Sequence, residues 1–210
     1  MPLPDLTAVA NLALDHLGEP YLASYETDAG VTADACRLHL PQCVETVLEG
    51  HAWSFATRQA SLSSTASAVG GVYGTAYVLP ADSLRLLRIN DEDLDVARNR
   101  FEVQARYVLL RETTTELLAI SYITNNPPVI EWPTTFADAV CFLLASRLAP
   151  KLTQDHNISA AFLGRHEQAL GKARSKDTRE TRSKENFGPR DLAARSGLVR
   201  VRYGKNHPPY

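Results

Sequence analysis

The spacing of apolar residues changes twice along this chain, and that change limits the possible folds more than any other feature. Helical spacing, with apolar residues three to four positions apart, occurs in two segments near the start of the chain and in two segments near its end. The predicted helices cover residues 5–17, about 31–50, 136–148 and about 153–184. Because an amphipathic helix must bury its apolar side, we predict that these four helices pack into one bundle.

Strand-type spacing, rich in β-branched and aromatic residues, occupies the middle of the chain. The predicted strands cover residues 79–90, 101–110 and 116–124, after a loop at 66–74. We therefore predict an α+β fold: a helical bundle with an inserted small antiparallel β module, arranged as a meander, and an extended C-terminal arm. The predicted domains are the bundle at residues 1–57 and 133–187, the β module at 58–132 and a docking arm at 188–210.

Glycine, proline and short polar residues set the predicted helix ends. Gly18 should end the first helix. Because proline lacks a backbone N–H, Pro41 should kink or split the second helix, and Pro150 should break or bend the chain after the third. The predicted N-caps are Thr134 or Thr135 for the third helix and Thr153 or Asp155 for the fourth. The residues of the fourth helix expected to face the third are Ile158, Ala161, Phe162, Ala169 and Ala173.

The bulk composition is that of a globular protein. With 210 residues and 44% hydrophobic content, the chain can form a sizeable core. Three cysteines are too few for a disulfide framework and indicate a reducing compartment. The N-terminus lacks the pattern of a signal peptide, and the longest apolar run, residues 139–145, is too short for a membrane span. We therefore expect a soluble protein made in a cytoplasm, with no membrane partner.

One cluster of potential metal ligands lies on the second predicted helix. Cys36, His39 and Cys43 share one helix face, and His51 or His16 could supply a fourth zinc ligand. Their spacing matches no established zinc motif, and helix-borne cysteines usually pack in a core. We therefore expect core packing here. A Cys/His nucleophile pair is equally disfavoured, because nothing in the sequence supplies an oxyanion hole or an orienting acid.

Other candidate sites are weaker. The acidic run at residues 91–95, followed by Glu102, copies part of an EF-hand loop, but Val96 stands where the loop requires glycine, so we expect a solvated hairpin turn. The glycines at 70–74 lack the Lys-Ser/Thr of a phosphate-binding loop. Three further acids at predicted turns or strand edges are expected to be solvated: Glu112, Glu116 and Glu131. The sequence therefore predicts no catalytic residue, no cofactor site, no metal site and no enzymatic activity.

Charge is distributed unevenly along the chain. Residues 172–210 hold eleven Lys/Arg against four Asp/Glu, whereas residues 1–171 hold eleven Lys/Arg against twenty Asp/Glu. Three interpretations of the basic segment remain open: a solvated helix with ion pairs, a nucleic-acid-binding segment, and a segment that docks on an acidic protein surface. The distribution favours an acidic body whose basic end binds a partner.

The end of the chain favours the docking interpretation. Residues 198–203 alternate apolar and basic side chains and could add a strand to the sheet edge of a partner protein. Apolar residues at a chain end without a core of its own also favour a partner. The predicted docking residues are Leu192, Arg195, Leu198, Val199, Arg200, Val201, Arg202, Tyr203 and Tyr210.

Several motifs, in order, resemble one family. They are Asn11-Leu12-Ala13-Leu14, Leu17-Gly18-Glu19-Pro20, His51-Ala52-Trp53-Ser54-Phe55-Ala56, residues 77–87 and 119–123, Trp132-Pro133-Thr134-Thr135-Phe136-Ala137-Asp138-Ala139 and Leu148-Ala149-Pro150-Lys151-Leu152-Thr153. Their order over residues 11 to about 175 resembles the head-to-tail adaptors of tailed phages, in particular those like tail tubular protein A of short-tailed phages. Each motif alone is short, so the resemblance depends on their order.

The resemblance implies a structural protein and not an enzyme. Family members combine a helical bundle with a strand-rich insertion and form a dodecameric ring beneath the portal protein. The implied partners are the portal protein, a downstream nozzle or tail-tube protein, other copies of this chain, and double-stranded DNA that passes through the lumen without specific binding. The implied location is the neck of the virion, and the host cytoplasm during assembly. The arm from about residue 188 would then dock on the portal.

Three alternatives stay open beside the adaptor. The basic residues from Lys172 to Lys205 could bind nucleic acid. The chain could instead be another ring component, such as a head-completion or tail-terminator protein. The third alternative, an unrecognised hydrolase using Cys36 and His39 or Cys141, has the least support.

Overall fold

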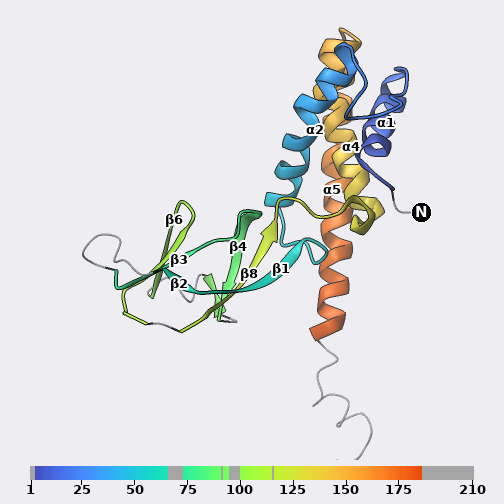
Figure 1. The fold of residues 1–210 in the computed structure, drawn as a ribbon. Coiled ribbons are helices and arrows are strands. Elements are labelled where there is room, and N and C mark those ends of the chain that lie inside the picture. The colour runs from blue at the N-terminus through green and yellow to red at the C-terminus, as the bar shows by residue number, and fades with distance from the viewer. Residues whose placement is uncertain (1–2, 66–72, 91, 95–99, 115, 186–210) are drawn as a thin grey trace, which may run out of the picture. The chain divides into compact units, whose positions relative to one another are not determined.

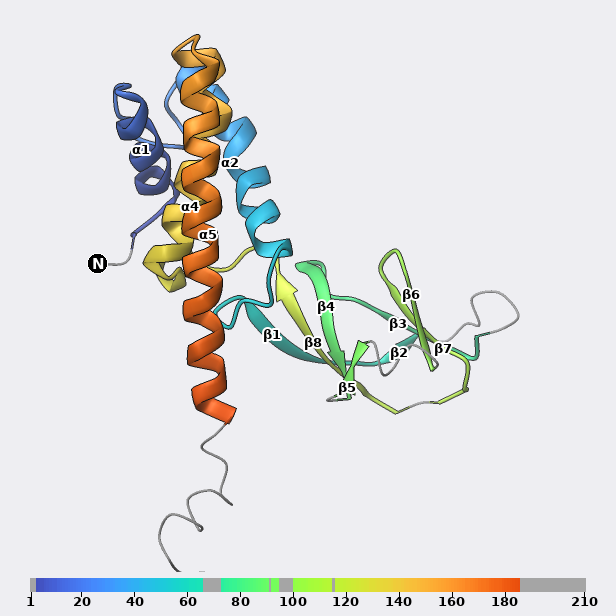
Figure 2. The same ribbon diagram turned by 180° about the vertical axis from the view of Figure 1, so that it is seen from behind.

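The protein has an α+β fold, as predicted. The computed structural model describes residues 3–65, 73–90, 92–94, 100–114 and 116–185, which form four α-helices, one short 3-10 helix and two antiparallel sheets (Figures 1 and 2). The chain divides into two compact units, residues 1–174 and residues 175–210. The first unit contains both sheets, the first three α-helices and the part of the last α-helix up to residue 174. The predicted arm at 188–210 lies outside the described residues. The predicted domain boundaries within the first unit stay predictions.

The first helix, α1 (Leu6–Leu17), has the ends that its sequence predicts. The carboxylate of Asp5 accepts a hydrogen bond from the backbone N–H of Ala8 at 2.8 Å, which satisfies one of the free donors of the first turn. Gly18 adopts a left-handed conformation, with φ 71°, and donates its N–H to the carbonyl of Asp15. Glycine adopts this conformation at little cost, so α1 ends here.

The prolines interrupt the helices less than expected. Helix α2 (Val31–Glu49) is one continuous helix through Pro41, so the predicted split is wrong. Helix α4 (Thr134–Leu152) likewise continues two residues beyond Pro150, so the predicted break is also wrong. The alternatives, a kink at Pro41 and a bend at Pro150, stay predictions. Pro150 cannot donate to the carbonyl of Ser146, but the hydroxyl of Ser159 donates to that carbonyl at 2.7 Å. This contact from the next helix replaces the missing bond, which makes a proline in the last turn tolerable.

One of the two predicted N-caps is wrong. Helix α4 begins directly after Pro133, whose carbonyl accepts the N–H groups of Phe136 and Ala137, and no side chain caps it. Neither predicted threonine is therefore the cap. Helix α5 (His156–Glu185) starts after Asp155, whose carboxylate accepts the N–H of Asn157 at 2.7 Å. Of the two candidates for this cap, the structure selects the aspartate.

Helix α4 forms the centre of the bundle. Both α1 and α2 pack on it (Figure 1), and one continuous core draws buried residues from α1, α2, α4 and the first part of α5. On α5, Phe162, Ala169 and Ala173 are buried as predicted and Ile158 is half-buried, but Ala161 is exposed. The sequence analysis missed His166, which is 7% exposed and places its Nδ1 2.8 Å from the carbonyl oxygen of Ala139 on α4.

The strands form two sheets and not the predicted single meander. The first sheet has the order β1-β8-β4-β5, so β8 lies between strands that precede it in the chain. Its members are β1 (Thr57–Leu62), β8 (Leu118–Thr124), β4 (Ser83–Ile89) and β5 (Glu92–Asp93). The second sheet has the order β2-β3-β7-β6. Its members are β2 (Ser64–Thr65), β3 (Thr75–Val78), β7 (Tyr107–Leu110) and β6 (Phe101–Gln104).

Two of the three predicted strands are in fact pairs of elements. The segment predicted as one strand at 79–90 begins with a turn, and only its second part is β4. The segment at 101–110 is a hairpin of β6 and β7, which turns at Ala105 with φ 50°. Strands β1, β2 and β3 were not predicted at all, and β5 lies at residues that were predicted as a turn, because Glu92 and Asp93 pair with the end of β4. Strand β1 is rich in polar and small residues and only partly buried, so its strand conformation depends on pairing with β8.

Strand β8 connects the first sheet to the bundle. Its residue Ile123 is fully buried in the core of the bundle, and Leu84 and Leu87 of β4 pack against that core. A second, separate core, which includes Tyr77, Val108 and other apolar residues, holds the two sheets together. The first sheet is therefore attached to the bundle through the end of β8 and the neighbouring strand β4.

Candidate functional site

Four aromatic side chains meet where the strands join the bundle, and we call this group the aromatic junction (Trp53, Phe55, Trp132 and Phe136). Phe136, at the start of α4, is fully buried and contacts the other three rings edge-to-face, with ring centroids 5.1 Å, 4.8 Å and 5.1 Å away. Such edge-to-face pairs add to the stabilisation that buried aromatic area provides. The junction therefore fixes both chain connections, residues 50–56 and 125–133, to the same helix.

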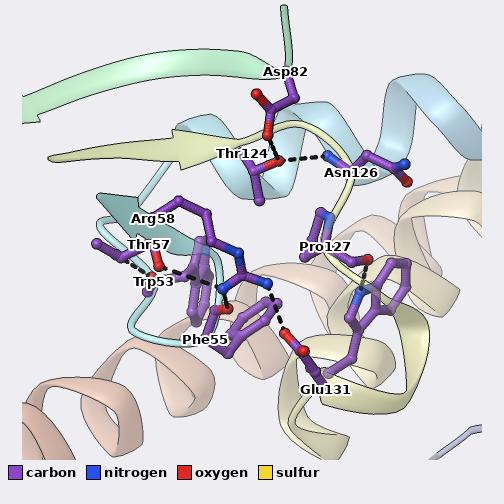
Figure 3. Close-up of polar contacts among 10 residues, drawn as sticks. Trp53, Phe55, Thr57, Arg58, Asp82, Thr124, Asn126, Pro127 and Glu131 are labelled. Carbon is purple, nitrogen blue, oxygen red and sulfur yellow. Dashed lines mark hydrogen bonds and ion pairs between the residues drawn. The ribbon is translucent and has the colours of Figure 1, made fainter. Parts of the chain in front are cut away.

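Both tryptophans of the junction are hydrogen-bonded. The indole N–H of Trp53 donates to the carbonyl of Val47 at 2.9 Å. The indole N–H of Trp132 donates to the carbonyl of Pro127 at 3.0 Å, and Figure 3 shows this acceptor. Trp53 is 1% exposed and Trp132 is 4% exposed. A buried N–H without an acceptor would cost a few kcal/mol, so these bonds make tryptophan acceptable at both positions.

A polar bridge crosses the junction on its outer side. Arg58 of β1 donates through Nη1 to the carbonyl of Phe55 at 3.0 Å, and its Nη2 lies 2.8 Å from Oε2 of Glu131 (Figure 3). Glu131 ends the 3-10 helix η1 (Val129–Glu131), just before α4. The bridge therefore connects the first strand to the connection that leads back into the bundle.

Polar contacts also hold the end of β8. Thr124 donates from its hydroxyl to the carboxylate of Asp82 at 2.9 Å, and the same hydroxyl oxygen accepts the N–H of Asn126 (Figure 3). The phenol of Tyr122 donates to the same carboxylate at 3.3 Å. Burial and the neighbouring Asp82 raise the pKa of Tyr122, so the phenol stays protonated and acts as a donor.

We expect the Arg58–Glu131 pair to contribute little to stability. Both side chains are partly exposed, 37% and 45%, and such pairs are typically worth about 0.5 kcal/mol. A double-mutant cycle of Arg58→Ala and Glu131→Ala, followed by urea unfolding, should give a coupling energy of about this size. A coupling above about 2 kcal/mol would show that the pair is better shielded from water than its exposure indicates.

A cleft of about 680 Å³ lies beside the junction. Its walls come from the start of α1, the loop at residues 24–26, the middle of α2 and the connection at 125–132. Leu40, Val44 and Trp132 are buried lining residues, and the side chain of Ile130 stays 63% exposed. The lining includes three carboxylates and, among its described residues, no Lys, Arg or His. The sequence analysis missed this cleft because its walls come from four separate segments.

The predicted core role of the helix-borne cysteines is confirmed. Cys36, Cys43 and Cys141 are all buried, and burial raises their pKa to about 11, about 11 and about 12. A thiol with such a pKa is protonated at neutral pH, so the thiolate, which is the reactive form, is scarce at all three positions.

The three histidines considered as zinc ligands lie next to aromatic rings or basic side chains. His16 stacks on Phe142 with ring centroids 5.0 Å apart, and His51 lies edge-on to Trp53 at 4.8 Å. Burial, together with Arg147 and Lys151, lowers the pKa of His39. Among the residues that the structure describes, no three His, Cys, Asp or Glu side chains form a metal-binding group.

The cysteines should react very slowly with thiol reagents in the folded protein. Because burial raises their pKa to about 11 or above, the thiolate fraction at pH 8 should be at least about 100-fold lower than for an exposed cysteine. The reaction with a thiol-specific chromogenic disulfide, followed with and without urea, measures this ratio. One thiol that reacts at the unfolded rate in native buffer would contradict the expectation and reopen the hydrolase alternative.

The other candidates from the sequence are not brought together. In the acidic run, Glu92 pairs with Arg100, and Asp93 pairs with Arg88 at 2.9 Å, whereas residues 91 and 95–99 lie outside the described residues. Glu112 and Glu116 lie between β7 and β8, whereas Glu131 lies on η1, where it is paired with arginine. Residues 70–72 also lie outside the described part of the chain.

The basic segment is only partly described. Lys172, Lys176 and Arg179 are exposed on α5, and the side chains from residue 182 onward lie outside the described residues. All nine predicted docking residues, from Leu192 to Tyr210, also lie outside them. The docking interpretation of this segment therefore stays a prediction.

No family model matches the chain, and no curated protein matches it. Within the described residues, every helix is too short or too polar to cross a membrane.

Proposed function

We propose that this protein is a structural head-to-tail adaptor of a tailed phage. In this role, copies of the chain form a ring beneath the portal, link the capsid to the tail, and line the channel through which DNA passes. The chain would act in the neck of the virion, after assembly in the host cytoplasm. Its partners would be the portal protein, a downstream nozzle or tail-tube protein and other copies of itself, with twelve copies as the expected ring.

The observation that carries the proposal is the convergence of two motifs. The motif at residues 51–56 and the motif at residues 132–139 lie about eighty positions apart, yet together they supply all four rings of the aromatic junction. These motifs belong to the ordered set that resembles the adaptors. Together they fix a strand module to a helical bundle, which is the combination that the resemblance implies.

The charge distribution fits this role. A body with excess negative charge would repel the DNA backbone and let it slide, whereas a basic end would be free to bind protein. An interface between two different surfaces, repeated around an axis, closes into a ring. Both arguments apply to any protein ring that surrounds DNA. They therefore support a ring-forming neck protein more strongly than they support the adaptor position directly beneath the portal.

Co-expression with the portal protein of the same genome tests the proposal. We expect a complex in which electron-microscope class averages show a ring of this chain stacked on the portal. A bare portal, with this chain as a monomer beside it, would overturn the adaptor assignment.

Nucleic-acid binding is the second candidate, because eleven basic residues lie in the last 39 positions. It requires an affinity for DNA that falls steeply as salt rises, with a slope that decreases when arginines of residues 172–205 are replaced. Absence of salt-sensitive binding in gel-shift titrations would exclude this candidate.

A further inference from the structure

The cleft beside the junction has a distinctive chemistry. Its apolar part includes Leu40, Val44 and Trp132, and its acidic part includes Asp5, Glu26 and Glu45. The carboxylate of Asp5 already accepts one hydrogen bond as the cap of α1, whereas Glu26 and Glu45 are exposed. A ligand that suits this cleft therefore presents apolar side chains together with positive charges.

The last part of the same chain has this chemistry. Residues 198–205, which we call the arm segment, read Leu-Val-Arg-Val-Arg-Tyr-Gly-Lys and contain three cationic residues and no acid. In an extended peptide, alternate side chains lie on opposite sides. Leu198 would thus lie on the same side as Arg200 and Arg202, whereas Val199, Val201 and Tyr203 would lie on the other, so a cleft with acidic and apolar walls could contact both sides of the segment.

We propose that the cleft of one copy binds the arm segment of a second copy of this chain. Arg200 and Arg202 would pair with the exposed carboxylates Glu26 and Glu45, and the apolar side chains of the segment would cover the apolar lining near Ile130. No other component is needed, so the inference goes beyond the adaptor proposal and does not depend on the portal.

A second copy is the occupant because the charge imbalance of the chain is itself complementary. Each copy carries an acidic body, which includes the cleft, and a basic end, which includes the arm segment. When the basic end of one copy binds the body of the next, both charges are compensated, and the pair still has one unused cleft and one unused arm segment with which further copies can associate. In an adaptor ring, the arm segment could not occupy a cleft and the portal at the same time, so portal binding would compete with this contact.

Two charge-reversed variants of the full-length chain test the inference. The cleft variant carries Glu26→Arg and Glu45→Arg, and the arm variant carries Arg200→Glu and Arg202→Glu. Analytical ultracentrifugation at about physiological ionic strength should show concentration-dependent association of the natural chain, and each variant alone should associate at least about tenfold more weakly. A matched control, Glu102→Arg with Glu167→Arg, changes the same charge at exposed positions on β6 and α5 and should leave association unchanged.

The decisive sample is a mixture of the two variants. The natural arm of the cleft variant fits the natural cleft of the arm variant, and the two reversed surfaces also fit each other. The mixture should therefore associate about as strongly as the natural chain. A mixture that stays monomeric would overturn the inference. It would mean that the arm segment binds the cleft of its own copy or does not bind the cleft at all. Circular dichroism of each variant checks that it is folded.

Photo-cross-linking identifies the binding surface directly. A benzophenone amino acid in place of Tyr203 should link to a second, isotope-labelled copy within residues 24–26, 40–45 or 125–132. Links to any other region, or links only within one copy, would also overturn the inference. Neither experiment contains portal protein, so either can fail while the adaptor proposal stands, and the reverse also holds.

Discussion

Trp53→Ala should destabilise the protein by about 3–5 kcal/mol, a large share of the about 5–15 kcal/mol that holds a typical domain together. The side chain is 1% exposed and contacts Phe136 edge-to-face, with ring centroids 5.1 Å apart. Its removal would leave a cavity at the point where strands and helices meet, and the surrounding rings can close that cavity only in part. Urea unfolding followed by circular dichroism measures the loss.

Leu163→Ala is the matched control. Leu163 lies on α5 and is 46% exposed, so its truncation should change stability by no more than about 0.5 kcal/mol. Equal unfolding midpoints for the natural protein and the Trp53→Ala variant would contradict the packing of the aromatic junction. They would also weaken the adaptor proposal, which is argued from the two motifs that meet there.

Deletion of residues 188–210 should abolish stable binding to the portal. If the arm supplies the main contacts, its loss should weaken the complex by at least about 100-fold, because a few buried anchor residues carry most of the energy of an interface. The deletion leaves all described residues in place, so the circular dichroism spectrum should keep its helical signal. Co-purification of the co-expressed proteins, with the portal carrying the affinity tag, is the measurement.

A shuffled arm separates two explanations of that result. A variant in which residues 192–210 are permuted keeps the charge and composition but breaks the alternation of apolar and basic side chains. If binding depends on the order of these residues, the shuffled arm should fail as the deletion does. Full binding by the shuffled arm would reduce the contact to unspecific charge attraction, and full binding by the deletion variant would refute the docking role of the arm.

Helices were predicted well because their signals are local. The spacing of apolar residues, together with Gly18 after α1 and Asp155 before α5, depends on neighbours within one or two turns. One error occurred where a distant residue compensates for a local defect. Pro150 fails to break α4 because Ser159 of the next helix donates to the carbonyl that the proline leaves free.

Strands were predicted less well because their partners lie far away in the sequence. Strand β1 has few of the residues typical of strands, and it is a strand because it pairs along its whole length with β8, about sixty positions later. Residues 101–110 show a continuous strand-type composition, yet the chain turns at Ala105 so that β6 can pair with β7. The local composition of a segment does not indicate which distant strand it pairs with.

The α+β class, the positions of the helices and the uneven charge were decided by the sequence alone, since each depends on residues close together in the chain. Only the tertiary structure brought residues 51–56 and 132–136 into one junction and built a cleft from four separate segments. The physical reason is that side-chain packing and strand pairing stabilise contacts between residues far apart in the sequence. Which of the possible partners a residue contacts depends on the whole fold. The aromatic junction and the cleft are therefore properties of the tertiary structure.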